Sequence, residues 1–318
     1  MRRSPFASVL LLIACDNTSG SPADQEVVQS AVLRECNIQL RYQPALPSER
    51  STFAYDASTP LDLIATPESQ ASGLTISRIR FRSGSGGEAT GYLVVPRGSG
   101  PFPAVVVQHG MPGSARGAIG DGRMSADHGV VLIAIDAHWN NRSGDVLNFT
   151  AQDSAEQVRL IVDIRRAVDY LISRSDVDRN RIAYWGLSYG GAMGALVAGV
   201  EPRFKTLILT VADGGLVNHF TGPEDANGMF DPISCQDKRA WISALLPIEP
   251  IRFIGLASAP LLMQSGRSDD LVPSADAERL QRFAPANKKI LWYNAGHGLP
   301  PQAHTDRLNW LREHIGLR

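Results

Sequence analysis

Ser188 is the residue whose surroundings most clearly predict chemistry. It is the central residue of Gly-Leu-Ser-Tyr-Gly at 186–190, which matches the pattern G-x-S-x-G. The motif directly follows an apolar, strand-like run at 182–185 and opens a segment of small residues at 191–198. A strand, a sharp turn and a helix in this order lift a serine hydroxyl above the edge of a sheet, where it can act as a nucleophile. The motif therefore predicts acyl transfer through a covalent intermediate on Ser188, which needs a base to take the hydroxyl proton.

This setting resembles the nucleophile turn of the α/β-hydrolase superfamily, in which nucleophile, acid and histidine follow one another along the chain. The resemblance implies a base late in the chain. His297 comes just after the last predicted strand at 289–293, whereas His304 lies in a predicted helix. We expect His297 to be the base, because loops at the carboxyl ends of strands hold the sites of such sheets. His304 is the alternative.

The acid that orients this histidine is expected between Ser188 and His297. Residues 266–273, Gly-Arg-Ser-Asp-Asp-Leu-Val-Pro, resemble the G-x-x-D-x-x-V-P loop of the superfamily, which implies Asp269 as the acid. The neighbouring Asp270 is the alternative. The acid would fix the histidine tautomer and stabilise the imidazolium without taking the proton itself.

A further loop is a candidate oxyanion hole. Residues 108–113, Gln-His-Gly-Met-Pro-Gly, follow a predicted strand at 104–107 and resemble the HGxxG loop of esterases. The resemblance implies two backbone donors for the oxyanion, the N–H of Tyr189 and an N–H of this loop, which we expect to be that of Met111. We interpret His109 as a residue that structures the loop and lines the site, and not as a base.

Two finer features resemble dienelactone hydrolase-like esterases and the catalytic domains of prolyl oligopeptidase-type peptidases. They are the elbow Gly-Leu-Ser-Tyr-Gly-Gly at 186–191 and its lead-in Asp-Arg-Asn-Arg-Ile at 178–182. Dienelactone hydrolases proper use cysteine where this chain has Ser188, so a dienelactone is not the expected substrate. Peptidases of this type carry a large β-propeller, for which the residues between Cys15 and about residue 74 are too few.

The remaining chain supplies the elements that would position these residues. A predicted hairpin begins at about residue 74, and unbroken apolar runs follow it, which is typical of strands covered on both faces. Amphipathic segments between the runs predict helices, the longest at 154–173. This alternation predicts a mostly parallel sheet with an antiparallel N-terminal hairpin and helices on both faces, which is the α/β-hydrolase fold, over 74–318.

Two further segments are candidates for shaping the substrate site. His138 and Trp139 follow the predicted strand at 130–135, so they should rim the same face of the sheet. Residues 213–258 form a long connection, in which Trp241 could belong to a small cap over an acyl pocket. A surface insertion packed on the core is an equal alternative.

The first residues predict export. Arg2 and Arg3 precede a mostly apolar run at 4–14, which is too short to cross a bilayer as a helix. The run ends in Leu-Ile-Ala-Cys, which resembles the bacterial lipobox. The resemblance implies a signal peptide over 1–14 and a lipid anchor on Cys15, with an ordinary secretory signal as the alternative.

The expected location is therefore the bacterial cell envelope, with secretion as the alternative. We expect residues 15–73 to form a polar tether and an N-terminal extension of the catalytic domain. An exported chain could pair Cys36 with Cys235. Two unpaired thiols are the alternative, because the sequence does not give the distance between them.

Composition narrows the function. The chain has 318 residues, 43% of them hydrophobic and 20% charged, and a formal net charge of −1, so nothing indicates a nucleic-acid partner. No H-x-x-x-H or C-x-x-C pair is present, so neither a metal nor another cofactor is expected. The expected activity is hydrolysis of small-molecule carboxylic esters with a small to medium acyl chain. A serine peptidase or amidase is the alternative, and a non-catalytic envelope binding protein is a third possibility.

Overall fold

The computed structural model describes residues 27–28, 31–71, 73–120, 123–221 and 232–318. The predicted signal peptide at 1–14 and the predicted lipidation site Cys15 lie outside these residues. Over the described ranges, no helix has both the length and the hydropathy that crossing a membrane requires.

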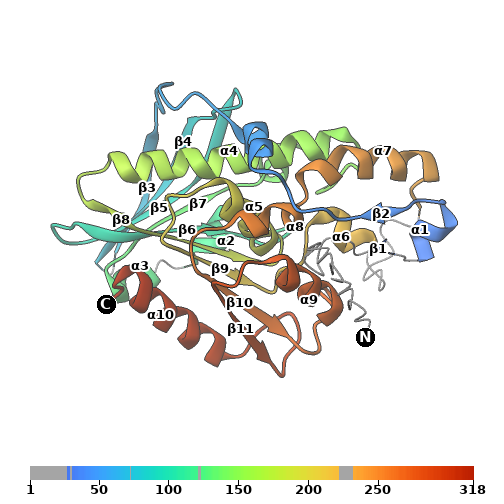
Figure 1. The fold of residues 1–318 in the computed structure, drawn as a ribbon. Helices are drawn as coiled ribbons and strands as arrows, with labels where there is room; N and C mark the ends of the chain where they lie inside the picture. The colour runs from blue at the N-terminus through green and yellow to red at the C-terminus, as the bar shows by residue number, and fades with distance from the viewer. Residues whose placement is uncertain (1–26, 29–30, 72, 121–122, 222–231) are drawn as a thin grey trace, which may run out of the picture.

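A nine-stranded sheet runs through the described part of the chain, in the order β11-β10-β9-β8-β6-β7-β5-β4-β3 (Figure 1). The pairs among β6 to β11 are parallel, whereas β3, β4, β5 and β7 pair antiparallel in succession. The predicted sheet is thereby confirmed, with β4 and β5 as the expected hairpin and β3 added outside it. The strands are β3 (Ile64–Ala71), β4 (Leu74–Arg82), β5 (Glu88–Pro96), β6 (Phe102–Gln108), β7 (Val131–Ile135), β8 (Val177–Leu187), β9 (Thr206–Thr210), β10 (Leu261–Gly266) and β11 (Lys288–Tyr293).

The central strands are covered on both faces, as their apolar runs predict. Every residue of β6, β7, β9 and β10 is buried. Alternate side chains enter two hydrophobic cores: Val106 contributes to the core on one side of the sheet, and Val105 and Val107 to the core on the other. Helices must therefore lie against both faces.

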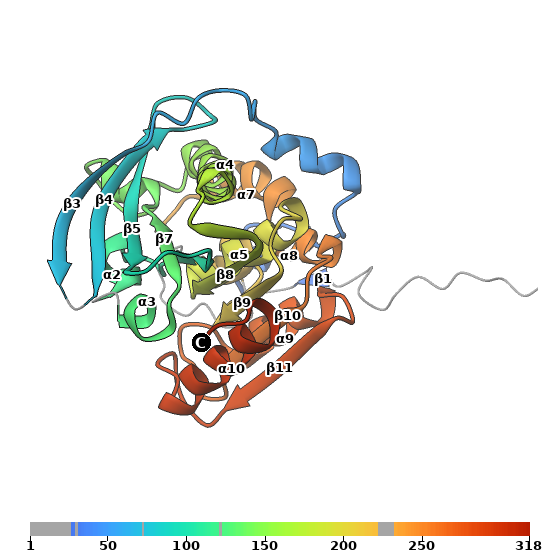
Figure 2. The same cartoon turned by 90° about the vertical axis from the view of Figure 1, so that its left-hand side faces the viewer.

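Figure 2 shows these layers, with α4, α5, α7 and α8 on one side of the sheet and α2, α3 and α10 on the other. The long helix α4 begins after Thr150, whose hydroxyl accepts the N–H of Gln152 at 3.3 Å. The helices are α1 (Ala31–Glu35), α2 (Ala115–Ile119), α3 (Arg123–His128), α4 (Ala151–Ser173), α5 (Tyr189–Val200), α6 (Leu216–Thr221), α7 (Cys235–Leu245), α8 (Pro250–Phe253), α9 (Ser274–Phe283) and α10 (Pro301–Ile315).

The N-terminal extension wraps against the face that carries α5 and α8. It contains a small antiparallel pair, β1 (Val27–Val28) with β2 (Leu40–Arg41), and a 3₁₀ turn at Pro47–Phe53. Arg50 Nε donates to the carbonyl of Gly199 at the end of α5, at 2.7 Å. The ring of Phe53 meets that of Phe253 edge-on, with centroids 5.4 Å apart. The extension is thus packed on the main body of the chain.

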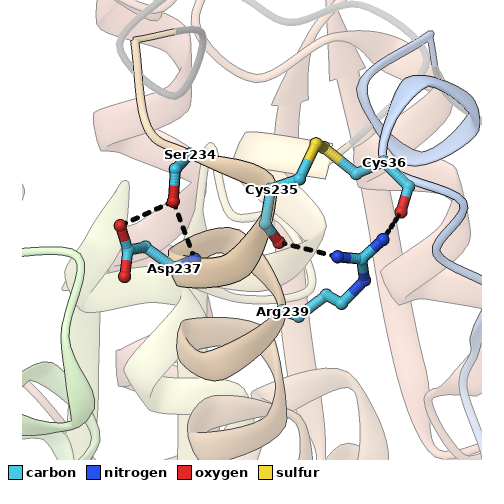
Figure 3. The surroundings of a disulfide bond; sticks show 5 residues. All are labelled: Cys36, Ser234, Cys235, Asp237 and Arg239. Carbon is cyan, nitrogen blue, oxygen red and sulfur yellow. Dashed lines mark hydrogen bonds between the residues drawn. A yellow bond between two sulfur atoms is a disulfide. The ribbon is translucent and has the colours of Figure 1, made fainter.

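A disulfide joins this extension to the start of α7 (Figure 3). It links Cys36 and Cys235, whose Cα atoms lie 5.2 Å apart. The guanidinium of Arg239 donates to the carbonyl oxygens of both cysteines. Ser234 caps α7 by accepting the N–H of Asp237 at 3.2 Å. Of the two alternatives that the sequence left open, the structure shows the bonded pair.

Candidate active site

Ser188 lies on a sharp turn between β8, which ends at Leu187, and α5, which begins at Tyr189. Its backbone has φ 55° and ψ −120°, a region that residues other than glycine rarely adopt and that recurs at functional sites. A Cβ at Gly186 would lie 2.0 Å from the carbonyl oxygen of Gly190, and one at Gly190 would lie 2.3 Å from that of Gln108. Both glycines of the motif are therefore required by close backbone contacts.

Asp269 and His297 meet at the carboxyl ends of β10 and β11. Nδ1 of His297 lies 2.9 Å from Oδ2 and 3.0 Å from Oδ1 of Asp269. The Asp269 side chain is buried, and its Oδ1 also accepts the N–H groups of Leu271 and Val272, both at 2.9 Å. Since an ionised carboxylate only accepts, His297 donates through Nδ1, and its Nε2 is left as the basic nitrogen. The neighbouring Asp270 is exposed to solvent.

Ser188 and His297 line the same open cavity of about 470 Å³, together with Gly110 and Met111. The loop after β6 passes very close to the serine, since a Cβ at Gly110 would lie 3.2 Å from Cβ of Ser188. The structure thus gathers the expected nucleophile, the His–Asp pair and the expected oxyanion loop around one space. His304, the alternative base, lies in α10 and is not among the described residues that line this cavity.

His109 stabilises the loop after β6. Its Nδ1 lies 2.8 Å from the carbonyl oxygen of Gly110, and its Nε2 accepts the N–H of Ala137 at 3.1 Å. Burial lowers the pKa of His109, which favours the neutral ring that these two contacts require. Trp139 also holds the loop, because its Nε1 donates to the carbonyl of Gly113 at 3.1 Å. His109 is one of the residues that line the open cavity.

A second, mostly apolar pocket of about 260 Å³ meets the open cavity at Ser188. Its apolar lining comes from the loops after β6 and β10, from the segment before α4 and from α6. These side chains are Met111, Val146, Leu147, Leu216, Phe220 and Leu271. Met111 and Leu271 line both spaces, so the serine lies where the apolar pocket meets the larger cavity.

The three other residues expected to line the substrate site, His138, Trp139 and Trp241, are not among the described residues that line this pocket. His138 and Trp139 line a much smaller adjoining cavity, and the Trp139 ring meets that of Tyr189 edge-on at 5.1 Å. Burial lowers the pKa of His138 to about 4. Trp241 has no exposed surface and is not among the described lining residues, so the expected contact with substrate is wrong.

Trp241 instead ties α7 to α4. Its Nε1 donates to Oδ2 of the buried Asp153 at 2.8 Å, and its ring meets that of Phe220 at 5.9 Å. The described part of the 213–258 segment is therefore an insertion packed on the core, and α6 with the residues just before it is the part that reaches the pocket. Residues 222–231 of the segment lie outside the described ranges.

One pair at the pocket was not predicted from the sequence. Nδ1 of His219 lies 2.8 Å from Oδ2 of Asp213, and both residues line the apolar pocket. Asp213 follows β9 at its carboxyl end, so the rule on strand ends that favoured His297 could have indicated it. His219 comes from α6, and no sequence motif distinguishes it.

A buried carboxylate holds the helix that carries this pair. Glu249 is fully buried and accepts the N–H groups of Val217 and Asn218, at 3.0 and 3.1 Å. Burial raises its pKa to about 8, with Asp213 contributing in the same direction.

Over the described ranges, no group of three or more His, Cys, Asp or Glu side chains is arranged to hold a metal ion.

Comparison with known proteins identifies the family of this chain. The profile of the prolyl oligopeptidase family matches residues 122–317. The chain is 24% identical over 316 residues to the uncharacterized peptidase YuxL of Bacillus subtilis, covering 93% of this chain and 46% of YuxL. It is 22% identical over 255 residues to the acetyl esterase Axe7A of Xylanibacter ruminicola, covering 71% of this chain and 56% of Axe7A. The chain therefore spans less than two thirds of either relative.

The fold has solved counterparts. An acetyl xylan esterase from Paenibacillus sp. R4 matches with a TM-score of 0.67 and 19% sequence identity, over 84% of this chain and 92% of that one. At this identity the likeness shows a shared fold. It agrees with the α/β-hydrolase architecture of the sheet described above.

Proposed function

The chain belongs to the prolyl oligopeptidase family, and we propose that it hydrolyses carboxylic esters with a small to medium acyl chain through an acyl-serine intermediate. One observation carries the proposal: Ser188 stands where a mostly apolar pocket meets an open cavity that also holds His297, the partner of Asp269. The apolar pocket offers a place for the acyl chain, and the open cavity a place for the leaving alcohol.

In the proposed reaction, Oγ of Ser188 attacks the ester carbonyl while Nε2 of His297 takes the hydroxyl proton. The N–H groups of Tyr189 and Met111 stabilise the oxyanion of the tetrahedral intermediate. His297 then gives its proton to the departing alcohol, and the acyl group stays on Ser188. Water attacks the acyl-serine with His297 again as base, which releases the acid and restores the serine.

A peptidase is the second candidate, and the family match is the observation that favours it. The same nucleophile, base and oxyanion donors serve amide hydrolysis, since the histidine can protonate an amine as it does an alcohol. Support for the ester comes from the acetyl esterase among the relatives and from a pocket beside Ser188 that is mostly apolar.

The test compares p-nitrophenyl esters of two to eight acyl carbons with aminoacyl p-nitroanilides. We expect faster turnover of the esters, and Ser188→Ala should lower kcat more than about 10³-fold. Ser173→Ala is the matched control, because this serine is exposed at the end of α4 and should leave turnover unchanged. Faster turnover of the anilides would replace the esterase by the peptidase.

We also propose that the chain is exported and anchored in a bacterial envelope through a lipid on Cys15. The support is the sequence Leu-Ile-Ala-Cys after a short apolar run. Radiolabelled palmitate should be incorporated by the full chain in bacterial cells and lost in Cys15→Ser. Recovery of the unmodified chain in the medium would favour an ordinary secretory signal.

A further inference from the structure

The open cavity beside Ser188 has an apolar lining that the catalytic steps described above do not use. Its apolar side chains outside the loop after β6 are Val107, Ala118, Trp185, Leu187 and Leu271. Leu187 and Leu271 keep 42% and 43% of their surfaces exposed, although both are large hydrophobic residues. Exposed apolar side chains that gather beside a reactive group are typical of a ligand-binding surface.

Trp185 is the largest of these side chains, and its ring is held in place by two contacts. Its Nε1 donates to Oγ1 of Thr210 at 3.2 Å, and the guanidinium of Arg307 lies over the ring, 4.8 Å from its centroid. Arg307 is not among the described residues that line the cavity, so the cavity meets the part of the ring that the guanidinium leaves uncovered. A ring fixed in this way is a preorganised surface for a flat apolar ligand.

The position of Trp185 assigns this surface to one half of the substrate. Trp185 is paired with Val107 in the register of β8 and β6, so the two side chains lie next to each other on one face of the sheet. Both residues line the open cavity together with Ser188 and His297, and neither is among the described residues that line the apolar pocket. The surface therefore lies on the side of Ser188 that offers a place for the leaving alcohol.

The polar side chains of the cavity do not match an alcohol rich in hydroxyl groups. Both ring nitrogens of His109 contact backbone groups, and Oγ of Ser114 accepts the N–H of Gly117 at 3.2 Å. The side chain of Gln108 is buried, so its amide is not offered to a ligand in the cavity. No Lys, Arg, Asp or Glu occurs among the described lining residues. This lining favours an apolar alcohol over a sugar or another polyol.

We propose that Trp185 is a specificity-determining residue and that the cavity takes an aryl or arylalkyl alcohol as the alcohol part of the ester. This inference rests on the proposed ester hydrolysis and names its substrate class: esters of aromatic alcohols. The ester oxygen of the alcohol lies at Ser188 and His297, while its aromatic ring packs on Trp185.

The same surface gives the enzyme a second acceptor for the acyl group. An arylalkyl alcohol from solution binds beside Trp185, and its hydroxyl attacks the acyl-serine in place of water. His297 takes the hydroxyl proton and passes it to Oγ of Ser188, so a new ester forms and the free serine is restored.

The first test compares acetates that differ only in the alcohol: 2-phenylethyl acetate, ethyl acetate and glycerol monoacetate. All three give the same acetyl-serine, so the difference between them arises before that intermediate and is measured by kcat/KM. We expect kcat/KM, followed by acid release, to be about ten-fold higher for the 2-phenylethyl ester than for either other ester.

Variants of Trp185 assign this preference to the ring. Trp185→Ala should remove most of the ratio between the 2-phenylethyl and the ethyl ester, and Trp185→Phe should keep part of it. Trp292→Ala is the matched control and should keep the full ratio. Trp292 also lies beneath an arginine, Arg267, at 5.6 Å, but it is not among the described residues that line the cavity.

A second measurement uses the unchanged chain alone, so it does not depend on how the variants fold. The enzyme is given p-nitrophenyl acetate as acyl donor, with 2-phenylethanol and ethanol at equal concentration as acceptors. We expect about ten-fold more 2-phenylethyl acetate than ethyl acetate among the products, as measured by gas chromatography.

The outcomes separate this inference from the proposed function. Turnover of the esters without a preference for the arylalkyl alcohol in either measurement overturns the inference and leaves ester hydrolysis standing. A preference for the glycerol ester, or an arylalkyl preference that persists in a folded Trp185→Ala, does the same. An enzyme that turns over none of the esters overturns the proposed function and this inference with it.

Discussion

Asp269 and Asp270 are adjacent residues of the same type, but their burial and their partners differ. Asp269 is buried against His297 and held by two backbone N–H groups, whereas Asp270 is exposed. We expect Asp269→Asn to lower kcat by about 10⁴-fold, because the amide leaves the histidine in the wrong tautomer, as in other Ser-His-Asp triads. Asp270→Asn is the matched control, and its kcat should stay within about two-fold of that of the unchanged chain, because this residue is exposed. Equal losses in both variants would remove Asp269 from the triad.

For single residues, the sequence predicted the positions of those that belong to motifs. Ser188, Asp269 and His297 each lie in the turn or loop that follows a strand, so their place at one edge of the sheet could be expected. His219 and Trp241 belong to a connection without a motif. Whether such side chains face a pocket or a core depends on how the connection packs, so Trp241 was misplaced and His219 was missed.

The nucleophile turn is the element on which the site depends. A Cβ at Gly186 would lie 2.0 Å from the carbonyl of Gly190, and both residues belong to the turn around Ser188. We expect Gly186→Ala to destabilise the chain by about 3 kcal/mol, since the backbone must move to relieve the clash. Thermal unfolding of this variant and of Gly298→Ala tests this, because a Cβ at Gly298 meets no atom within 4 Å. Equal melting temperatures would show that the turn can relax.

Strands were easier to predict than connections. Residues 104–107 and 130–135 became β6 and β7 because continuous apolar runs must be covered on both faces. The edge strand β3 was not predicted, since Ile64–Ala71 contains Pro67 and Glu68 and pairs only with β4 on one side. The sequence predicted a long connection where α6 and α7 lie, but it left open whether this connection forms a cap or packs on the core.

The disulfide acts on the whole molecule, because Cys36 and Cys235 are 199 residues apart in sequence. Closing so long a loop restricts the unfolded chain and stabilises the fold by up to about 5 kcal/mol. We expect a reductant to lower the melting temperature of the unchanged chain. Cys36→Ser combined with Cys235→Ser should melt at the lower temperature with or without reductant. Two titratable thiols at these positions in the non-reduced, unfolded chain would contradict the bond.

Buried carboxyls should also make the stability of the molecule depend on pH. Burial raises the pKa of Glu249 from 4.5 to about 8 and that of Asp163 from 3.8 to about 7. Both groups bind a proton more tightly in the folded chain, so the free energy of unfolding falls as pH rises through these folded values. Burial lowers the pKa values of His138 and His109, so these two groups act in the opposite direction, mainly below their unfolded pKa of 6.5.

In the window from pH 6.5 to 8 the carboxyls therefore outweigh the histidines. We expect the free energy of unfolding to fall by about 2 kcal/mol across it, and Asp163→Asn to reduce that fall. Chemical denaturation at both pH values measures the difference. A stability that rises across this window would mean that these carboxyls are ionised in the folded chain.

The central claim is that Ser188 is a nucleophile activated by His297, and covalent labelling tests it most directly. The protein is treated with a fluorophosphonate, digested and analysed by mass spectrometry to locate the adduct. We expect a single adduct on the peptide that contains Ser188. It should be absent in Ser188→Ala and should form far more slowly in His297→Ala. A folded protein that stays unlabelled, or an adduct that persists in Ser188→Ala, would contradict it.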